Sequence, residues 1–339
     1  MMCKTTIRPF LHWGNVGWHL PLLLGALVFF SLSALGQTVE PNPPKSTAAD
    51  QTQIEDYLDR LIVSTAVAAD AASVIEEANR FRTEASQRLK HGRRDEGRAL
   101  LRQAAEVIAV AAPEGDEKRQ DPLLGEYLTE ITKELVALDT MKVAGDSFID
   151  AEPSANNARV AAFINYFQRR GRSRLEIGRS RLASYRPMMA QVFREEGVPE
   201  WLISVGFVES TYNSRAHSPK EAHGIWQFIP ATGDRYGLRR TAWTDERENP
   251  EKSTRAAARY LRDLHALFGD WQLALAAYNW GEGRVARLIR RTGIRDFWTM
   301  ADRGLLPQET ANYVPSVIAV SRLLLENANQ FTEVNAVSQ

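Results

Sequence analysis

The sequence of 339 residues has a single cysteine, Cys3, which lies before an apolar run near the amino terminus. If the amino-terminal segment is removed as a signal, the mature chain has no cysteine. Disulfides, thiolate catalysis and cysteine-ligated zinc are then excluded. Gln37 follows the small residues 34–36, so the segment also lacks the cysteine that carries the lipid of a lipoprotein.

The chain also lacks a net charge, because 42 basic residues balance 42 acidic ones. Binding to nucleic acid normally depends on a strong basic field, so we expect no nucleic-acid partner. The composition, with 44% hydrophobic residues, is typical of a globular protein. No strand-like alternation of useful length occurs, and we therefore predict an all-α fold.

Long hydrophobic runs are missing too: the apolar run at residues 20–35 is only 16 residues long. Lys4 and Arg8 precede it and small residues follow it, which is the layout of a secretory signal. A membrane span needs about 20 residues, so we favour a cleaved signal at 1–36 over an amino-terminal anchor. Both alternatives imply export to the periplasm or cell envelope.

Changes of composition divide the rest of the chain. Residues 37–50 contain three prolines and are typical of a linker. Residues 51–149 have helical periodicity and much alanine, and we predict a helical amino-terminal region that contacts envelope protein partners. A second boundary near residue 150 opens the domain at 150–330. Between 169 and 181 it contains six arginines, which we interpret as a solvated helix face rather than a contact with an acidic polymer.

An acidic residue, Glu209, occupies the apolar face of a predicted helix. At helical spacing, Leu202, Val205 and Gly206 share this face with it. An unpaired carboxylate there should have a raised pKa, and an acid that stays protonated near neutral pH can protonate a glycosidic oxygen. The alternative is a glutamate that turns to solvent or pairs with an arginine.

Further polar residues follow in three later segments. Gln227 is surrounded by apolar residues, Tyr278 and Asn279 end a helical segment, and Tyr313 lies near a helix start. Taken singly, each has a structural explanation, because an amide can satisfy backbone groups and a tyrosine ring can pack in a core.

Taken together, three blocks resemble a known family. They are Glu209-Ser210, residues 224–232 (Gly-Ile-Trp-Gln-Phe-Ile-Pro-Ala-Thr) and residues 277–281 (Ala-Tyr-Asn-Trp-Gly). They resemble the signature of the soluble-lytic-transglycosylase catalytic domain, which has the lysozyme-like fold of glycoside hydrolase family 23. Residues 306–315 resemble, more narrowly, the membrane-bound type D branch. That branch usually carries LysM repeats after the catalytic domain, whereas this chain stops at Gln339.

The resemblance implies a lytic transglycosylase that cleaves peptidoglycan glycan strands without a cofactor or a metal. Glu209 would protonate the oxygen between N-acetylmuramic acid and N-acetylglucosamine. It would then accept the proton of the muramic C6 hydroxyl, which closes a 1,6-anhydro ring. A hydrolytic muramidase, which normally uses two carboxyl groups, is the alternative enzyme. A catalytically silent wall-binding or scaffold protein is the alternative outside enzymes.

The resemblance also assigns substrate contacts. Ser218 and Gln227 would hydrogen-bond the acetamido group of the substrate or the acid itself, and Ile229 would supply an apolar wall. Tyr278 and Asn279 would line the site beneath the acid.

Tyr313 would orient the acid or the reaction intermediate. We also consider Trp226, Trp243 and Trp280 as surfaces on which a sugar ring could stack, with core packing as the alternative use.

Overall fold

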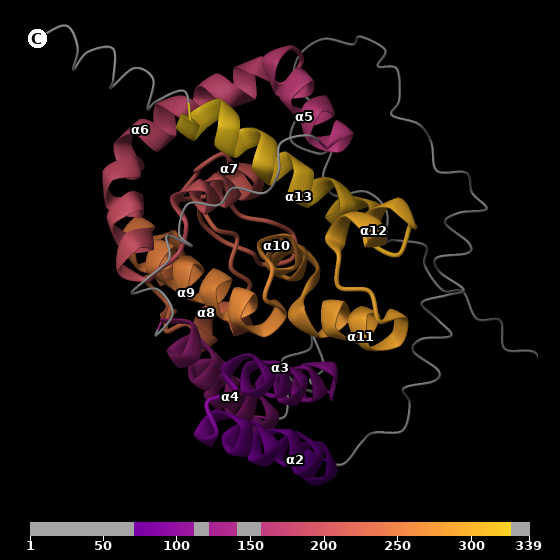
Figure 1. The fold of residues 1–339 in the computed structure, drawn as a ribbon. Helices are drawn as coiled ribbons and strands as arrows, with labels where there is room; N and C mark the ends of the chain where they lie inside the picture. Colours follow the sequence, from indigo (N-terminus) through magenta and orange to yellow (C-terminus); the bar gives the residue numbers. More distant parts are fainter. Residues whose placement is uncertain (1–70, 112–121, 141–156, 327–339) are drawn as a thin grey trace, which may run out of the picture. The chain divides into compact units, whose positions relative to one another are not determined.

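The computed structural model describes residues 71–111, 122–140 and 157–326. All of them belong to one compact unit, Ala68–Gln339. The predicted signal and linker therefore lie outside the described residues. Regular structure within the described ranges is helical, with only isolated β-bridges in loops, so the all-α prediction is confirmed (Figure 1). None of the described helices is both long and apolar enough to span a membrane.

Three helices make up the described amino-terminal part: α2 (Ala71–Lys90), α3 (Arg94–Ala111) and α4 (Pro122–Thr140). Gly92, with a φ of 73°, lies in the short turn between α2 and α3. The two helices pack closely because small side chains such as Ala78 and Ala104 are fully buried on their apolar faces. The alanine-rich sequence thus forms the helical region that its periodicity predicts.

The carboxy-terminal part begins at Asn157, whose side chain accepts the Arg159 N–H and caps the first helix. Its elements are α5 (Ala158–Gln168), α6 (Arg172–Glu195), the 3-10 helix η1 (Glu200–Ser204), α7 (Val205–Ser210), α8 (Pro230–Arg235), the 3-10 helix η2 (Glu246–Glu248), α9 (Pro250–Phe268), α10 (Trp271–Trp280), α11 (Glu282–Thr292), α12 (Phe297–Asp302), α13 (Gln308–Ser321) and the π-helical η3 (Arg322–Glu326).

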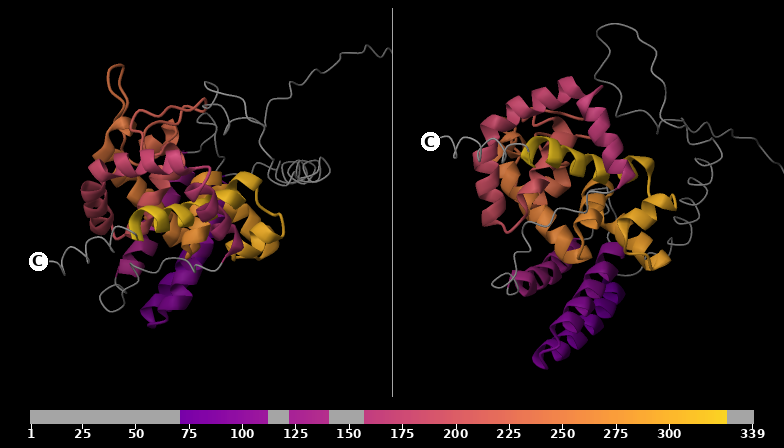
Figure 2. Two further views of the ribbon diagram at one scale, coloured as in Figure 1. Left: turned by 90° about the horizontal axis from the view of Figure 1, so that it is seen from above. Right: turned by 45° about the horizontal axis from the view of Figure 1, so that its top comes forward.

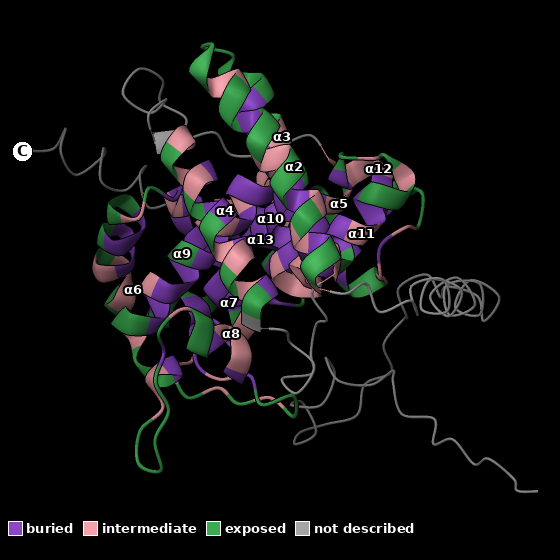
Figure 3. Cartoon of the chain, turned by 90° about the horizontal axis from the view of Figure 1, so that it is seen from below, coloured by how far each residue is buried: buried purple, intermediate pink, exposed green. Residues whose placement is uncertain are grey.

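Helix α10 is the centre of this part. It packs against α9, α11 and α13, and its residues 273–277 are buried (Figures 1 and 3). The sequence of this stretch, Leu-Ala-Leu-Ala-Ala, supplies apolar surface on every side of the helix, as a fully surrounded helix requires. Helix α6, which contains Pro187, curves around one side of the unit (Figure 2).

Helix α3 is bonded directly to the carboxy-terminal part. Arg102 Nε donates to Ala266 O at 2.9 Å near the end of α9, and Arg287 Nη1 of α11 donates to Val110 O at 2.9 Å near the end of α3. The Arg102 guanidinium also lies against Gly269, the left-handed residue that ends α9. The amino-terminal helices therefore support the two helices that flank α10.

We predict that Gly269→Ala destabilises the protein more than Gly293→Ala. Both glycines end a helix with a positive φ, so an added Cβ strains either backbone by about 1 kcal/mol. At Gly269 the Cβ would lie 2.7 Å from the Arg102 guanidinium, whereas nothing lies within 4 Å at Gly293. Displacing Arg102 costs its hydrogen bond as well, about 1 kcal/mol more. Urea unfolding measures both, and equal losses would contradict the packing of α3 on α9.

Candidate active site

Glu209 lies near the end of the short helix α7. The segment after Pro199 is not one α-helix as predicted, because residues 200–204 form η1 and the α-helix begins only at Val205. Leu202, Val205 and Gly206 are buried as their spacing indicates. Glu209, one turn further on, is only partly buried. The apolar face therefore ends at the acid.

Burial raises the pKa of the Glu209 carboxyl to about 7, well above its ordinary value. The charge of Glu309 also raises this pKa. Two groups oppose the rise: the hydroxyl of Tyr313, which donates to Glu209 Oε1 at 2.6 Å, and the guanidinium of Arg174. The expected rise is thus present, although the carboxyl has a hydrogen-bond partner. The balance of these opposing effects leaves both the protonated and the ionised form of Glu209 populated near neutral pH.

Tyr313 reaches Glu209 from the second turn of α13. Its ring is buried, with 6% of its surface exposed. Burial, together with the charge of Glu209, raises the pKa of the Tyr313 hydroxyl well above its ordinary value. The hydroxyl therefore stays protonated and remains a donor to the carboxyl at every pH of interest.

The end of α10 contributes Tyr278 and Asn279. The Tyr278 hydroxyl donates to Trp226 O at 2.8 Å, and Asn279 Oδ1 accepts the hydroxyl of Thr310 at 2.8 Å. Thr310 belongs to the first turn of α13, so these bonds connect α10 both to the segment before α8 and to α13. The charge of Glu209 contributes to the raised pKa of Tyr278, after burial, which indicates that this ring lies near the acid.

Gln227 adopts a left-handed backbone, with a φ of 49°, which is rare for a residue other than glycine. Its Nε2 donates to Gly224 O at 2.8 Å and to Ala216 O at 3.3 Å. The side chain thus holds the two ends of its own loop together while staying half-buried. Strained backbone of this kind persists where surrounding contacts hold it, and it is common at functional sites. Ile229 follows with 38% of its surface exposed.

Ser218 has a local structural use. Its hydroxyl oxygen accepts the backbone N–H groups of Lys220 and Ala222 at 3.2 and 3.1 Å, which closes a turn. Among the described residues, no hydrogen bond joins Ser218 to Glu209 or to Gln227. Its expected contact with the substrate therefore stays a prediction.

The three tryptophans differ in exposure. Trp226 is fully buried, donates its N–H to Thr254 Oγ1 at 3.1 Å and stacks on Phe193, so it is a core residue and cannot stack on a sugar. Trp280 is half-buried against the core. Trp243 has 93% of its surface exposed in the loop between α8 and α9.

Glu282, one of the other acidic residues of this domain, is held very differently from Glu209. It forms an ion pair with Arg235 at 2.7 Å and accepts the Tyr260 hydroxyl at 2.9 Å. Burial alone would raise the pKa of Glu282, but these partners outweigh it and keep the pKa below its ordinary value. Glu282 is therefore a partly buried structural anion that stays ionised at neutral pH.

The residues that the sequence reasoning missed are Arg174, Glu309 and Thr310. Glu309 lies one helical turn before Tyr313 on α13, so their spacing of four could have placed both on one face. Arg174 belongs to the basic run at 169–181. No local signal shows that α6 contacts the end of α7, because that contact depends on packing between distant segments.

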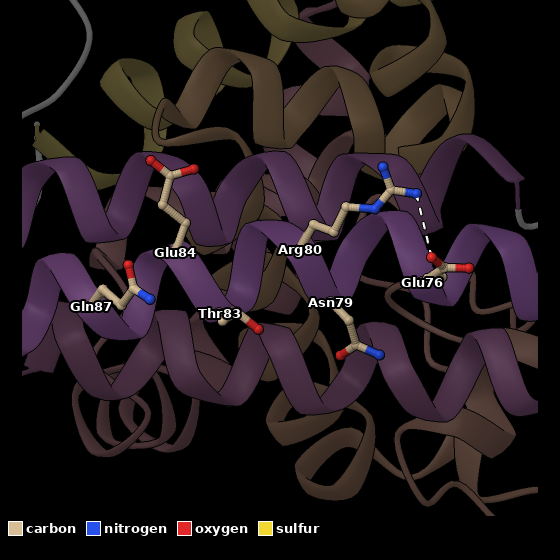
Figure 4. A pocket seen from close by; sticks show the side chains of 6 residues that line it. All are labelled: Glu76, Asn79, Arg80, Thr83, Glu84 and Gln87. Carbon is tan, nitrogen blue, oxygen red and sulfur yellow. Dashed lines mark ion pairs between the residues drawn. The ribbon is translucent and has the colours of Figure 1, made fainter.

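Hollows and charged clusters elsewhere do not compete with this site. An open polar groove of about 520 Å³ runs along α2, where Arg80 pairs with Glu76 at 3.6 Å (Figure 4). None of the site residues lines it. Over the described ranges, no group of three or more His, Cys, Asp and Glu side chains is arranged to hold a metal ion.

Comparison with known proteins agrees with the blocks around Glu209. Residues 190–301 match the family model of the transglycosylase SLT domain. The chain contains a transglycosylase SLT domain. This confirms the resemblance drawn from the sequence. The match includes Glu209, Gln227 and Tyr278 and ends before α13, which supplies Tyr313.

Two relatives and one solved structure illustrate the similarity. The chain is 40% identical over 149 residues to membrane-bound lytic murein transglycosylase D of Escherichia coli K12, which covers 42% of this chain and 32% of that protein. It is 31% identical over 186 residues to membrane-bound lytic murein transglycosylase F 2 of Alkalilimnicola ehrlichii, which covers 51% and 39%. The match thus spans about a third of the first relative. The 70 kDa soluble lytic transglycosylase of Escherichia coli aligns over 75% of this chain and 46% of that one, with a TM-score of 0.40 and 18% identity.

We predict that two substitutions move the pKa of Glu209 in opposite directions. Glu309→Gln removes a repelling charge and lowers the pKa, whereas Tyr313→Phe removes a hydrogen bond to the carboxylate and raises it. Titration of the Glu209 side-chain carbon by NMR in labelled protein measures both. Glu251→Gln, at another exposed glutamate in the first turn of a helix, is the matched control and should leave the titration unchanged. Shifts of the same sign in the first two variants would refute this account.

Proposed function

We propose that this chain is a lytic transglycosylase that cleaves the bond between N-acetylmuramic acid and N-acetylglucosamine in peptidoglycan. The observation that carries the proposal is Glu209, a carboxyl with a pKa of about 7 that accepts a hydrogen bond from a buried tyrosine. An acid near neutral pKa is protonated often enough to donate and is basic enough to accept in the next step. The SLT domain match and the names of the relatives support the same activity.

In the proposed reaction, protonated Glu209 donates its proton to the glycosidic oxygen as the bond to the muramic C1 breaks. The acetamido oxygen of the same sugar can stabilise the positive charge that develops at C1. Glu209, now a carboxylate, accepts the proton of the C6 hydroxyl while the C6 oxygen bonds to C1. The acid is thereby regenerated, and no water is consumed. The products are a 1,6-anhydro end and a free sugar hydroxyl.

The chemistry assigned to Glu209 needs both of its protonation states, and the surrounding groups fit this need. Tyr313 donates to the carboxylate and therefore stabilises the base, whereas burial and Glu309 stabilise the acid. Tyr278 and Asn279 border the same region from α10, and we propose that they and Gln227 contact the substrate. Ser218 would hydrogen-bond the acetamido group of the substrate, and the exposed Ile229 would supply an apolar wall.

A hydrolytic muramidase would need a second carboxylate to activate water. Glu309 is the acidic side chain whose charge acts on Glu209, but it is exposed on the first turn of α13. No observation favours hydrolysis. Glu309 already has another role, because its charge raises the pKa of Glu209. A silent scaffold has no need for an acid with a raised pKa, which disfavours that alternative as well.

The cellular setting is also a proposal. Export to the periplasm or cell envelope rests on the signal-like residues 1–36 and on relatives whose names call them membrane-bound. The amino-terminal helices would contact envelope proteins through the outer face of α2, where Glu76, Arg80 and Glu84 line the polar groove (Figure 4). The apolar side of α3 is already used in packing against α9 and α11.

We predict that Glu209→Gln lowers the rate of glycan cleavage by about 10²-fold to 10⁴-fold, the usual contribution of a positioned acid and base. Mass spectrometry of digested sacculi measures the products, and anhydro ends are lighter by one water than hydrolysed ends. The near-ultraviolet circular dichroism of the variant should match that of the wild type. Reducing ends from the wild-type enzyme, with equal loss of activity in Glu309→Gln, would instead establish a two-carboxylate hydrolase.

Glu209→Gln should also make the protein more stable at pH 8. The folded-state pKa of Glu209 lies above its unfolded value, so the folded chain loses stability as the pH rises from 4.5 through about 7. At about 1.4 kcal/mol per unit, this loss amounts to at most about 3 kcal/mol, and glutamine avoids it. Thermal unfolding at pH 4 and pH 8 tests the effect. The gain should vanish at pH 4, and Glu251→Gln should show none at either pH.

A further inference from the structure

All six arginines of the basic stretch between residues 169 and 181 are exposed, as a solvated helix face requires, but Arg174 and Arg181 also hydrogen-bond a neighbouring segment. Arg174, Gly178 and Arg181 fall on one side of α6 at helical spacing, and this side faces the end of α7. Gly178 lets the two helices touch, because a Cβ there would lie 2.4 Å from the ring of Phe207. The two arginines on either side of this contact reach the residues that follow Glu209.

The turn after α7 is strained. Thr211 and Tyr212 have φ values of 55° and 56°, so two consecutive residues other than glycine adopt the left-handed conformation. The β-branched side chain of Thr211 makes this conformation especially unfavourable, and such strain persists only where neighbouring groups hold it. Backbone bonds from Thr211 N to Phe207 O at 2.7 Å and from Tyr212 N to Gly206 O at 3.0 Å close the turn.

Arg174 binds this turn at three points. Its Nε donates to Thr211 Oγ1 at 2.9 Å, and its Nη2 donates to Val208 O at 3.1 Å and to Phe207 O at 3.3 Å. The guanidinium also lies over the ring of Phe207, 5.2 Å from its centre. One planar group therefore holds both the last carbonyls of α7 and the strained threonine, two residues beyond Glu209.

The charge of Arg174 is unusual for a structural arginine. Within the described part of the chain it forms no ion pair, and partial desolvation of its guanidinium against the turn lowers its pKa. Its partners are neutral oxygens, while the carboxyl of Glu209 feels its positive charge. Arg174 is an exposed residue of α6, so it keeps its charge while its guanidinium reaches the end of α7. Its bonds to the carbonyls of Phe207 and Val208 and to Thr211 place this charge beside the segment that carries Glu209.

We propose that Arg174 is a positioning residue for Glu209, which fixes the end of α7 so that the carboxyl stays aimed at the glycosidic oxygen. This inference rests on the proposed function of Glu209. Arg174 of α6 also supplies a cation whose effect on Glu209 is opposite in sign to that of Glu309 of α13. Replacing it should therefore change both the geometry and the titration of Glu209.

Three variants separate these two effects. Arg174→Lys keeps the charge but loses the planar group that binds three oxygens, so kcat should fall about tenfold to a hundredfold while the pH profile stays in place. Arg174→Met loses both, so kcat should fall further and the basic limb of the pH profile should move to higher pH. Arg181→Met is the matched control, because Arg181 Nη1 donates to Thr211 O at 3.1 Å without acting on the charge of Glu209. It should lower the Tm and leave the pH profile in place.

NMR titration of Glu209 in the same variants gives a readout that needs no turnover. The proposal predicts a higher pKa in Arg174→Met and wild-type values in Arg174→Lys and Arg181→Met. A wild-type titration in Arg174→Met, or full kcat in Arg174→Lys, would overturn it. If the wild-type protein releases no anhydromuropeptides, the proposed function fails, and the titration still reports on Arg174. If Arg174→Met does not fold, Arg174→Lys decides the question through its kcat.

Discussion

The hydrogen bond from Tyr313 to Glu209 is the contact on which the site depends. A carboxyl as desolvated as Glu209 would be a poor base if nothing stabilised its ionised form, and a fully paired one would be a poor acid. The 2.6 Å hydrogen bond from the buried Tyr313 hydroxyl stabilises the carboxylate only in part, so Glu209 can act both as an acid and as a base. It also joins residues 104 positions apart, so forming it requires α13 to cross the end of α7. The packing of α13 against α7 and the titration of the acid are therefore linked through this contact.

The other site residues also connect elements of the fold. Tyr278 binds the carbonyl of Trp226, and Asn279 binds Thr310 of α13. Gln227 closes its own strained loop. Each polar group that borders the proposed substrate site thus uses part of its hydrogen-bonding capacity to fix its position, which reduces the entropy lost when a substrate binds.

Features that depend on one segment could be predicted from the sequence, and features that depend on packing could not. The apolar face that ends at Glu209 follows from periodicity, and the helical character of the chain follows from the lack of alternation. Periodicity does not distinguish a 3-10 turn from an α-helical one, so η1 was missed. The partners of Arg174 lie more than thirty residues away, and a count of arginines cannot show which of them bonds to another segment. Trp226 was ambiguous because core rings and sugar-stacking rings have the same local sequence context.

The amino-terminal helices stabilise the part of the fold that holds the site. The raised pKa of Glu209 and the left-handed Thr211 and Tyr212 each cost stability, and they occur within four residues. Helix α10 supplies Tyr278 and Asn279, so it must keep its position although these features lower the stability of the protein. Its neighbours α9 and α11 are held from outside by α3, through the bonds of Arg102 and Arg287. The amino-terminal helices, which lie outside the SLT match, therefore help to keep the strained site in place through their support of α9 and α11.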